Sequence, residues 1–328
     1  ARSVVIKVLR HQLRDDPAFD ALFRQEGSMT MQLAHPNICT VYDFGKQNDL
    51  FFIAMEHVDG VTLWEILGRL SRQKKRIQPA LAVAILSRVA AALDYAHHAR
   101  DSKRKVLGVV HRDVSPHNVM VRFDGVVKLL DFGVAKVQSQ EETEEKSMVK
   151  GKSAYLAPEQ CQSKPLDGRC DVFALGICLF ESLTGRRLYR RDGAFETFKA
   201  IVQEPPPDLS KHFDPGLAKI VTTALGKAPE DRYPTAGKMH LEMERWLSEQ
   251  REVITAARLE DFLHELFGED ADRAPTLERG PEAIARLKAN APVSAPVPET
   301  TTRPKWMWMA AAAAVIGISG GAYAAVSL

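Results

Sequence analysis

The chain has 328 residues, enough for one large two-lobed domain with an appendage. Its 44 lysine and arginine residues nearly balance its 42 aspartate and glutamate residues, so the formal net charge is only +2. This balance argues against a nucleic-acid-binding protein, and we interpret the short basic clusters at 72–76 and 103–105 as solvated loops. No two cysteines form a Cys-x-x-Cys pair, which disfavours a zinc or redox motif and fits a reducing cytosol; they are Cys39, Cys161, Cys170 and Cys178.

Residues 1–58 predict a small β-rich unit. Phe19–Leu33 carries apolar residues at helical spacing, and Glu26 lies within this predicted helix. β-branched and aromatic residues favour strands, and three runs fit that pattern: Val4–Lys7, Ile38–Phe44 and Leu50–Met55. The first strand therefore ends in a lysine, and the helix after it carries a glutamate.

Residues 59–250 predict a larger helical unit. Ala80–His97 is alanine-rich, with apolar residues at three- and four-residue steps, which predicts a buried helix. A second buried helix begins at Asp171–Gly176. Further helices are expected over 195–203, 216–225 and 235–250, and an extra amphipathic helix over Arg251–Phe267 within a C-terminal extension, 251–269.

The segment between the two buried helices holds polar motifs at close spacing. His111-Arg112-Asp113 is followed by Asn118 and then by Asp131-Phe132-Gly133. Phosphoryl transfer needs such a set, because one carboxylate accepts the proton of the attacking hydroxyl while an amide and a second carboxylate hold magnesium ions. Ala157-Pro158-Glu159 lies downstream, before the helix that begins at Asp171.

The C-terminal part predicts a linker and a membrane anchor. Residues 270–305 are rich in proline, alanine and threonine, which is typical of a flexible linker. The last 23 residues, Trp306–Leu328, contain no charge. As a helix they would span about 34 Å, enough for a bilayer core of about 30 Å, so we expect a single transmembrane helix. Arg303 and Lys305 flank it, which places the preceding domain in the cytoplasm. An alanine-rich soluble tail is the alternative, and a Gly-x-x-x-Gly step at 317–321 could support a homodimer.

The order of these motifs resembles the eukaryotic-type serine/threonine protein kinases, and more closely their bacterial members. The resemblance covers roughly residues 1–250. It implies an α+β, two-lobed protein-kinase-like fold with a partial β-rich N-lobe over 1–58 and a helical C-lobe over 59–250. The implied function is ATP-dependent transfer of the γ-phosphate to serine or threonine hydroxyls of protein substrates in membrane-tethered signalling, with ATP and Mg²⁺ as cofactors.

The resemblance also implies the roles of single residues. Asp113 is expected to be the catalytic base, and Asn118 and Asp131 to hold Mg²⁺. Lys7 is expected to contact the α- and β-phosphates, positioned by Glu26. Adenine and the hinge that holds it are expected to involve Val5, Met55, Glu56, Val58 and Met120.

Other motif residues are implied to have structural roles. His111 and Phe132 would join a hydrophobic stack, so His111 is not the expected base. Asp171 would accept hydrogen bonds from the backbone of the catalytic loop. Glu159 and Arg232 would form a buried ion pair.

Two positions depart from the pattern of the serine/threonine kinases. Ser115 stands where those kinases usually carry lysine, and Lys152 follows Gly151 where they usually carry threonine. Both departures weaken the preference for serine or threonine over tyrosine without removing the base or a metal ligand. Arg112 is expected to receive a phosphate from the activation segment, whose candidate acceptors are Ser139, Thr143, Ser147 and Ser153.

A Gly-x-Gly-x-x-Gly loop should precede the lysine strand of a kinase, but the residues between Ala1 and this strand are too few to contain it. We expect the sequence to be an N-terminally truncated kinase. A pseudokinase or nucleotide-binding scaffold is the alternative, but the intact Lys7, Asp113, Asn118 and Asp131 favour an enzyme. A small-molecule phosphotransferase is disfavoured by Ala157-Pro158-Glu159 and the helix at Asp171, which build a peptide-docking lobe in protein kinases.

Overall fold

The computed structural model describes residues 3–8, 17–47, 50–101, 103–132, 152–268 and 324–327. The chain divides into two compact units. The first unit comprises Ala1–Met31, Thr40–His57 and Arg273–Leu328, and the second comprises Gln32–Cys39 and Val58–Asp272.

In its described residues, the first unit contains a four-stranded antiparallel sheet and one helix. The strand order is β2-β3-β1-β7, and the elements are β1 (Ser3–Val8), α1 (Pro17–Met31), β2 (Val41–Gln47), β3 (Leu50–Glu56) and β7 (Ala324–Ser327). Strand β1 is the predicted lysine strand, and Lys7 lies opposite Ile53 of β3. The predicted strand at 38–44 is shifted, because Ile38 makes an isolated bridge to Leu129 and the regular strand begins only at Val41.

Helix α1 packs on this sheet through the fully buried Phe23. Phe23 contacts Phe51 at a ring-centroid distance of 4.9 Å and Phe44 at 5.9 Å. Gly27 allows this close approach, because a Cβ atom there would lie 2.5 Å from the ring of Phe44. The backbone of Glu26 lies in the same helix, and its side chain is outside the described part of the structure.

The predicted transmembrane helix falls almost entirely outside the described residues. Of residues 306–328, only 324–327 are described, and they form β7, which pairs antiparallel with β1. At these four residues the helix prediction is wrong, because their backbone groups bond to the free edge of β1 instead of to one another. Within the described ranges, only α3 (Pro79–His98) is long and apolar enough to span a bilayer, and most of it is buried inside the second unit.

The second unit is mainly helical, with a small sheet of order β4-β5-β6. Its elements are β4 (Gly60–Thr62), α2 (Leu63–Arg72), α3, β5 (Val119–Arg122), β6 (Val127–Leu129), η2 (Lys152–Tyr155), α5 (Pro158–Cys161), α6 (Arg169–Thr184), α7 (Ala194–Gln203), α8 (Pro215–Ala224), η3 (Pro229–Asp231), α9 (Ala236–Glu249) and α10 (Ala256–Phe267).

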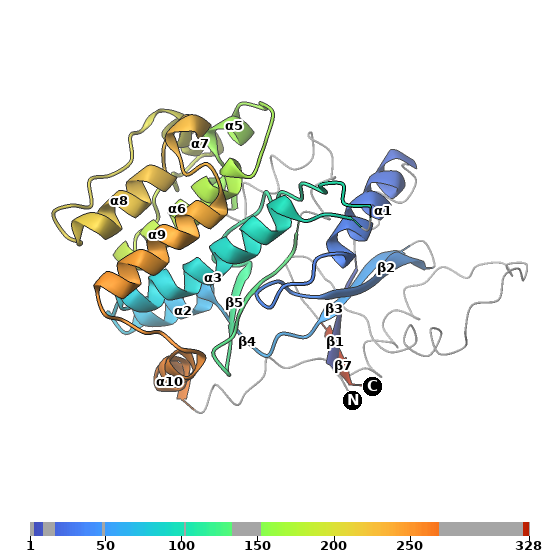
Figure 1. Cartoon of the computed structure of the whole chain (residues 1–328), viewed down its shortest axis with the longest axis horizontal. Coiled ribbons are helices and arrows are strands. Elements are labelled where there is room, and N and C mark those ends of the chain that lie inside the picture. The colour runs from blue at the N-terminus through green and yellow to red at the C-terminus, as the bar shows by residue number, and fades with distance from the viewer. Residues whose placement is uncertain are drawn as a thin grey trace, which may run out of the picture. The chain divides into compact units, whose positions relative to one another are not determined.

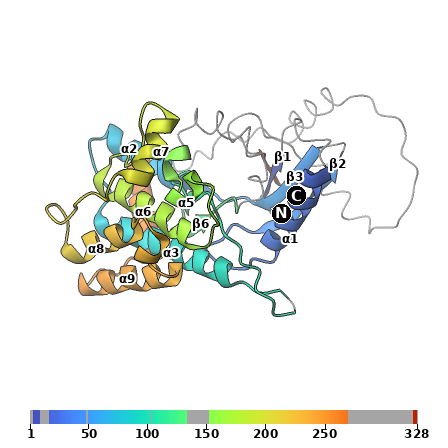
Figure 2. The ribbon, with the colours of Figure 1, turned by 90° about the horizontal axis from the view of Figure 1, so that it is seen from above.

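Helices α3 and α6 form the centre of this unit, since almost every residue of α6 and most of α3 are buried. Helix α9 runs alongside α3 (Figures 1 and 2). Polar caps define where the surrounding helices begin. Thr62 accepts from the backbone of Glu65 while the Glu65 carboxylate accepts from the backbone of Thr62, which fixes the start of α2.

Helix α10 packs against the rest of the second unit. Its buried side consists of Leu259, Phe262, Leu263 and Leu266. Arg88 donates to the carbonyl of Ile254 at 2.7 Å, just before the helix. The helix begins at Ala256 and not at the predicted Arg251, because Thr255 caps it by accepting from the backbone of Arg258. Gly125, in the turn between β5 and β6, lies so close to Ala256 that no larger residue fits there.

Candidate active site

The catalytic loop at 111–118 is held by one buried carboxylate. Asp171, in the first turn of α6, is 1% exposed and accepts from the backbone of His111 and Arg112, each at 2.8 Å. Arg112 has φ of +63°, a left-handed conformation that costs energy in a non-glycine residue. The carboxylate therefore stabilises a strained turn, which confirms the predicted role of Asp171.

A histidine supports this carboxylate. His97 of α3 lies 2.8 Å from Asp171 through Nε2. Burial alone would raise the pKa of Asp171, but the hydrogen bond from His97 and the backbone donor of His111 bring the pKa below its ordinary value. Asp171 is therefore ionised when it holds the loop.

Asp113 and Asn118 are directly connected. Asn118 is buried and donates through Nδ2 to the carbonyl of Asp113 at 2.7 Å and to its carboxylate at 3.0 Å. Because the amide nitrogen is used in this way, the amide oxygen of Asn118 is the atom that a cation would contact.

The hairpin β5–β6 brings the predicted metal ligands to one end. Val119 lies opposite Leu129, and the backbone of Leu130 donates to the carbonyl of Asn118 at 2.8 Å. Asp131 follows directly, with φ of +56°. Within the described ranges, no group of three His, Cys, Asp or Glu side chains forms a ready metal cage. An amide and a carboxylate fit Mg²⁺, which usually takes few protein ligands and completes its shell with water and phosphate oxygens.

His111 packs against Phe132 at a ring-centroid distance of 4.6 Å and is fully buried. Its Nδ1 accepts from the backbone of Asp113 at 3.2 Å, so Nε2 carries the proton and donates to the carbonyl of Leu130 at 2.8 Å. Burial lowers the pKa of His111, which keeps the ring neutral. The ring is thus a packing group, as predicted, and not a base.

The predicted ion pair between Glu159 and Arg232 is present. The guanidinium bonds to both carboxylate oxygens at 2.7 Å, and both side chains are buried. Its remaining N–H groups donate to the carbonyls of Gly226, Arg169 and Lys227. All five donors of the arginine are therefore satisfied.

A second buried cluster was missed at the sequence level. Tyr155 donates to the Glu181 carboxylate at 2.7 Å, and the backbone of Leu188 donates to the other oxygen at 3.2 Å. Arg187 lies over the rings of Tyr155 and Trp64 at 4.9 and 5.0 Å. The available signal was Glu181 itself, because a charged residue that follows the apolar run from Val172 to Phe180 requires a partner when it is buried.

The residues predicted to contact the nucleotide are divided between the units. In the first unit, buried Val5 lies opposite buried Met55, and Lys7 is on the same face of β1 as Val5. The backbone N–H of Glu56 already donates to the carbonyl of Thr40 at 2.8 Å. In the second unit, Val58 is buried, and Met120 of β5 lies opposite Thr62 of β4. The predicted Lys7–Glu26 pair remains a prediction.

The structure describes the side chain at only one of the two positions that depart from the kinase pattern, Ser115 and Lys152. Ser115 is 1% exposed, and in the described part of the chain its hydroxyl has no hydrogen-bond partner. Lys152 opens η2, and its side chain lies outside the described part. Of the candidate phosphoacceptors, Ser153 is buried, which argues against it, and the others lie outside the described residues: Ser139, Thr143 and Ser147.

Lys227, whose carbonyl accepts from Arg232, lowers the stability of the fold in a pH-dependent way. Its ammonium donates to the carbonyl of Ile201 at 2.6 Å and to the Tyr189 hydroxyl at 2.9 Å. Burial lowers the pKa of Lys227 to about 8, against the weaker raising influence of Glu204. The unfolded chain therefore holds the proton of Lys227 more tightly than the folded chain does. Below about pH 8 the charged lysine lowers the free energy of unfolding. This loss becomes smaller as the pH rises from the folded pKa toward the higher pKa of the unfolded chain.

We expect Lys227→Met to remove this dependence. Urea titrations at pH 7, 8.5 and 10 measure the free energy of unfolding of both proteins. The value for the variant minus the value for the wild type should be largest at pH 7 and should decrease as the pH rises. A difference that is constant with pH, or that grows, would contradict the assignment.

Comparisons with known proteins identify the family of the chain. The family model described as "Protein kinase domain" matches residues 1–247. The tyrosine-protein kinase MasK of Myxococcus xanthus is 36% identical over 283 residues, which cover 84% of this chain and 44% of MasK. The serine/threonine-protein kinase PknB of Mycolicibacterium smegmatis is 32% identical, with 97% of this chain and 49% of PknB covered.

Solved structures give the same result. The crystal structure of the PknI kinase domain of Mycobacterium tuberculosis is 30% identical, the match covers 74% of this chain and 84% of that chain, and the TM-score is 0.55. The chain spans about half or less of the length of the curated relatives named above. Since the family match covers most of the sequence, the chain belongs to the protein kinase family and has its two-lobed fold.

Proposed function

We propose that the chain is an ATP-dependent protein kinase that transfers the γ-phosphate to serine and threonine hydroxyls of proteins. The observation that carries this proposal is the arrangement of Asp113, Asn118 and Asp131. One hairpin and one loop held by Asp171 bring these three residues to the same end of β5 and β6. Kinase chemistry requires a base and two magnesium ligands placed in this way.

Each residue then has a defined task. Asp113 accepts the proton of the substrate hydroxyl through its carboxylate, which Asn118 orients by donating to Oδ2. Asn118 and Asp131 would hold Mg²⁺, which neutralises charge on the phosphates when bound. Lys7 would contact the α- and β-phosphates, and Val5 and Met55, which lie opposite each other in the first unit, would contact adenine.

The test is transfer of label from [γ-³²P]ATP with Mg²⁺ to a protein substrate and to the chain itself. Phosphoserine and phosphothreonine should be recovered after acid hydrolysis. ATP binding without any labelled polypeptide would refute the kinase proposal and favour a nucleotide-binding scaffold.

Tyrosine is the second candidate acceptor. Ser115 and Lys152 replace two residues typical of serine/threonine kinases, and the relative MasK is named a tyrosine-protein kinase. PknB, the other curated relative reported above, is named a serine/threonine-protein kinase, which favours the first candidate. The same hydrolysate separates them, because phosphotyrosine as the main product would establish the second.

We propose further that residues 306–328 anchor the protein as a single-pass membrane protein with the kinase domain in the cytoplasm. The support is the length of the charge-free segment and the flanking Arg303 and Lys305. Pairing of 324–327 with β1 competes with this arrangement. Full-length chain should stay in the membrane pellet after alkaline extraction, whereas a chain ending at residue 305 should be released; release of both would refute the anchor.

The possible homodimer rests on the same segment. Gly317 and Gly321 would place two helices in close contact. Replacing both by isoleucine should abolish crosslinking of two copies in membranes if this step is the contact. Unchanged crosslinking would exclude it.

A further inference from the structure

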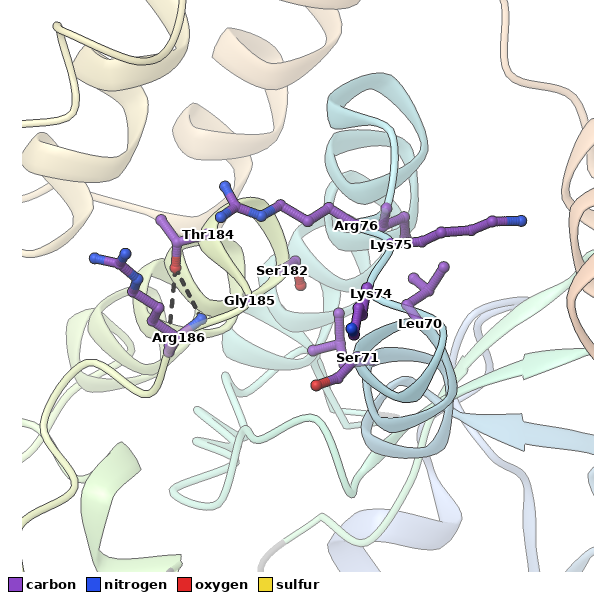
Figure 3. A pocket seen from close by; sticks show the side chains of 11 residues that line it. Leu70, Ser71, Lys74, Lys75, Arg76, Ser182, Thr184, Gly185 and Arg186 are labelled. Atoms are coloured by element: carbon purple, nitrogen blue, oxygen red, sulfur yellow. Dashed lines mark hydrogen bonds between the residues drawn. The ribbon is translucent and has the colours of Figure 1, made fainter.

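A pocket of about 290 Å³ lies between the C-terminal ends of α2 and α6 in the second unit (Figure 3). Leu67, Leu70 and Ile77 supply apolar lining. The loop after α2 and the corner after α6 supply basic side chains, and none of the eleven lining residues is acidic. The cluster that we interpreted as a solvated loop thus forms one wall of a concave site.

Three of the basic side chains are available to a ligand. Lys74, Arg76 and Arg186 are exposed, and across the described ranges their side chains have neither a hydrogen bond nor an ion pair. In Figure 3, Arg76 reaches from its loop toward Thr184, and Lys74 lies close to Ser71. Lys75, although it lines the pocket, extends in the opposite direction in the same view.

Compensation of the helix dipoles does not explain this charge. The C-terminus of a helix carries about half a negative charge, so the ends of α2 and α6 together contribute about one. Three cations therefore leave the pocket clearly positive. The hydroxyls of Ser182 and Thr184 already donate to the carbonyls of Cys178 and Phe180. Recognition of a ligand would thus depend on the cations, and these select an anion.

One face of α2 connects the pocket to the catalytic loop. Trp64, Leu67 and Ser71 follow one another at helical spacing on this face. The ring of Trp64 packs against His117 at 4.6 Å, and the backbone of Trp64 donates to the carbonyl of Pro116 at 3.0 Å. From Trp64 to Ser71 the helix rises by about 10 Å, which an extended peptide spans with roughly three residues.

We propose that this pocket binds an anionic side chain of the protein substrate, with phosphoserine or phosphothreonine as its best ligand, about four to six residues from the acceptor hydroxyl. The spacing adds one to three residues across the catalytic loop to the run along α2. A phosphate carries nearly two negative charges and three acceptor oxygens, which match three cations better than a carboxylate does. A concave site with apolar lining fits one side chain better than a flat membrane surface. The inference rests on the proposed kinase function.

The experiment uses peptides that share one acceptor serine and carry phosphothreonine, glutamate or alanine at each of the positions two to eight residues away on either side. The wild type should favour phosphothreonine over alanine in kcat/KM by about tenfold at low salt, at a spacing of four to six. In Lys74→Ala/Arg76→Ala this ratio should fall to about two or less. The matched control, Lys103→Ala/Lys105→Ala, removes two exposed cations from another loop and should keep the ratio.

A ratio that survives in the pocket variant, or that does not depend on position, would overturn the proposal. So would a variant that loses binding to phosphatidylserine vesicles while its peptide ratio is unchanged, since the pocket would then serve a membrane. Fluorescence anisotropy of a labelled phosphopeptide on Asp113→Asn protein tests the pocket without phosphotransfer. Variant-sensitive binding there would support the pocket even if no phosphotransfer were found, and binding that the variant leaves unaltered would overturn it.

Discussion

Asp113→Asn is expected to lower kcat for phosphotransfer by about 10²- to 10⁴-fold, the usual contribution of a positioned base. Asparagine has the same shape and keeps an oxygen that can accept from Asn118, which now donates to the Asp113 carboxylate at 3.0 Å. The loop geometry and the KM for ATP should therefore change little. Steady-state kinetics at saturating ATP and Mg²⁺ measure the effect, and unchanged thermal unfolding shows that the loop is intact.

Asp124→Asn is the matched control for this experiment. Asp124 lies in the turn of the hairpin β5–β6, and its carboxylate pairs with Arg122 at 2.7 Å at the surface. Its substitution changes the charge by the same amount but should leave kcat within about twofold, since exposed pairs contribute little. An Asp113→Asn enzyme with activity near that of the wild type would show that the base is elsewhere.

The sequence predicted those parts of the site whose chemistry lies in contiguous motifs. Asp113, Asn118 and Asp131 lie within 19 consecutive residues, and one loop followed by one hairpin is enough to bring them together. The cap by Asp171 and the pair of Glu159 and Arg232 join residues far apart in the sequence, and they were predicted only through the resemblance to protein kinases.

The sequence could not predict contacts that depend on how distant elements pack. Tyr155 and Glu181 meet only because η2 lies against α6. Ser153 was a candidate phosphoacceptor by composition, but the same short helix buries it. The pocket beside α2 needs the ends of two helices separated by more than a hundred residues, and no local pattern of hydrophobic residues encodes that meeting.

Arg232→Met is expected to destabilise the second unit by about 3–5 kcal/mol. The arginine satisfies both oxygens of Glu159, and its removal leaves a buried carboxylate without a counter-charge. The carbonyls of Gly226, Arg169 and Lys227 would lose their donors as well. For a unit of this size the melting temperature should fall by roughly 6–20 °C, measured by calorimetry or by tyrosine and tryptophan fluorescence.

The double variant Glu159→Leu/Arg232→Met separates the loss of the pair from the burial of an unpaired charge. It should be more stable than Arg232→Met alone, because replacing both partners by apolar groups removes the stranded carboxylate. Arg169→Met, which breaks the exposed pair with Asp167, should cost less than about 1 kcal/mol. If the double variant were the least stable of the three, the ion pair itself would be strongly stabilising. The loss of stability in Arg232→Met would then not come mainly from the buried, unpaired carboxylate of Glu159.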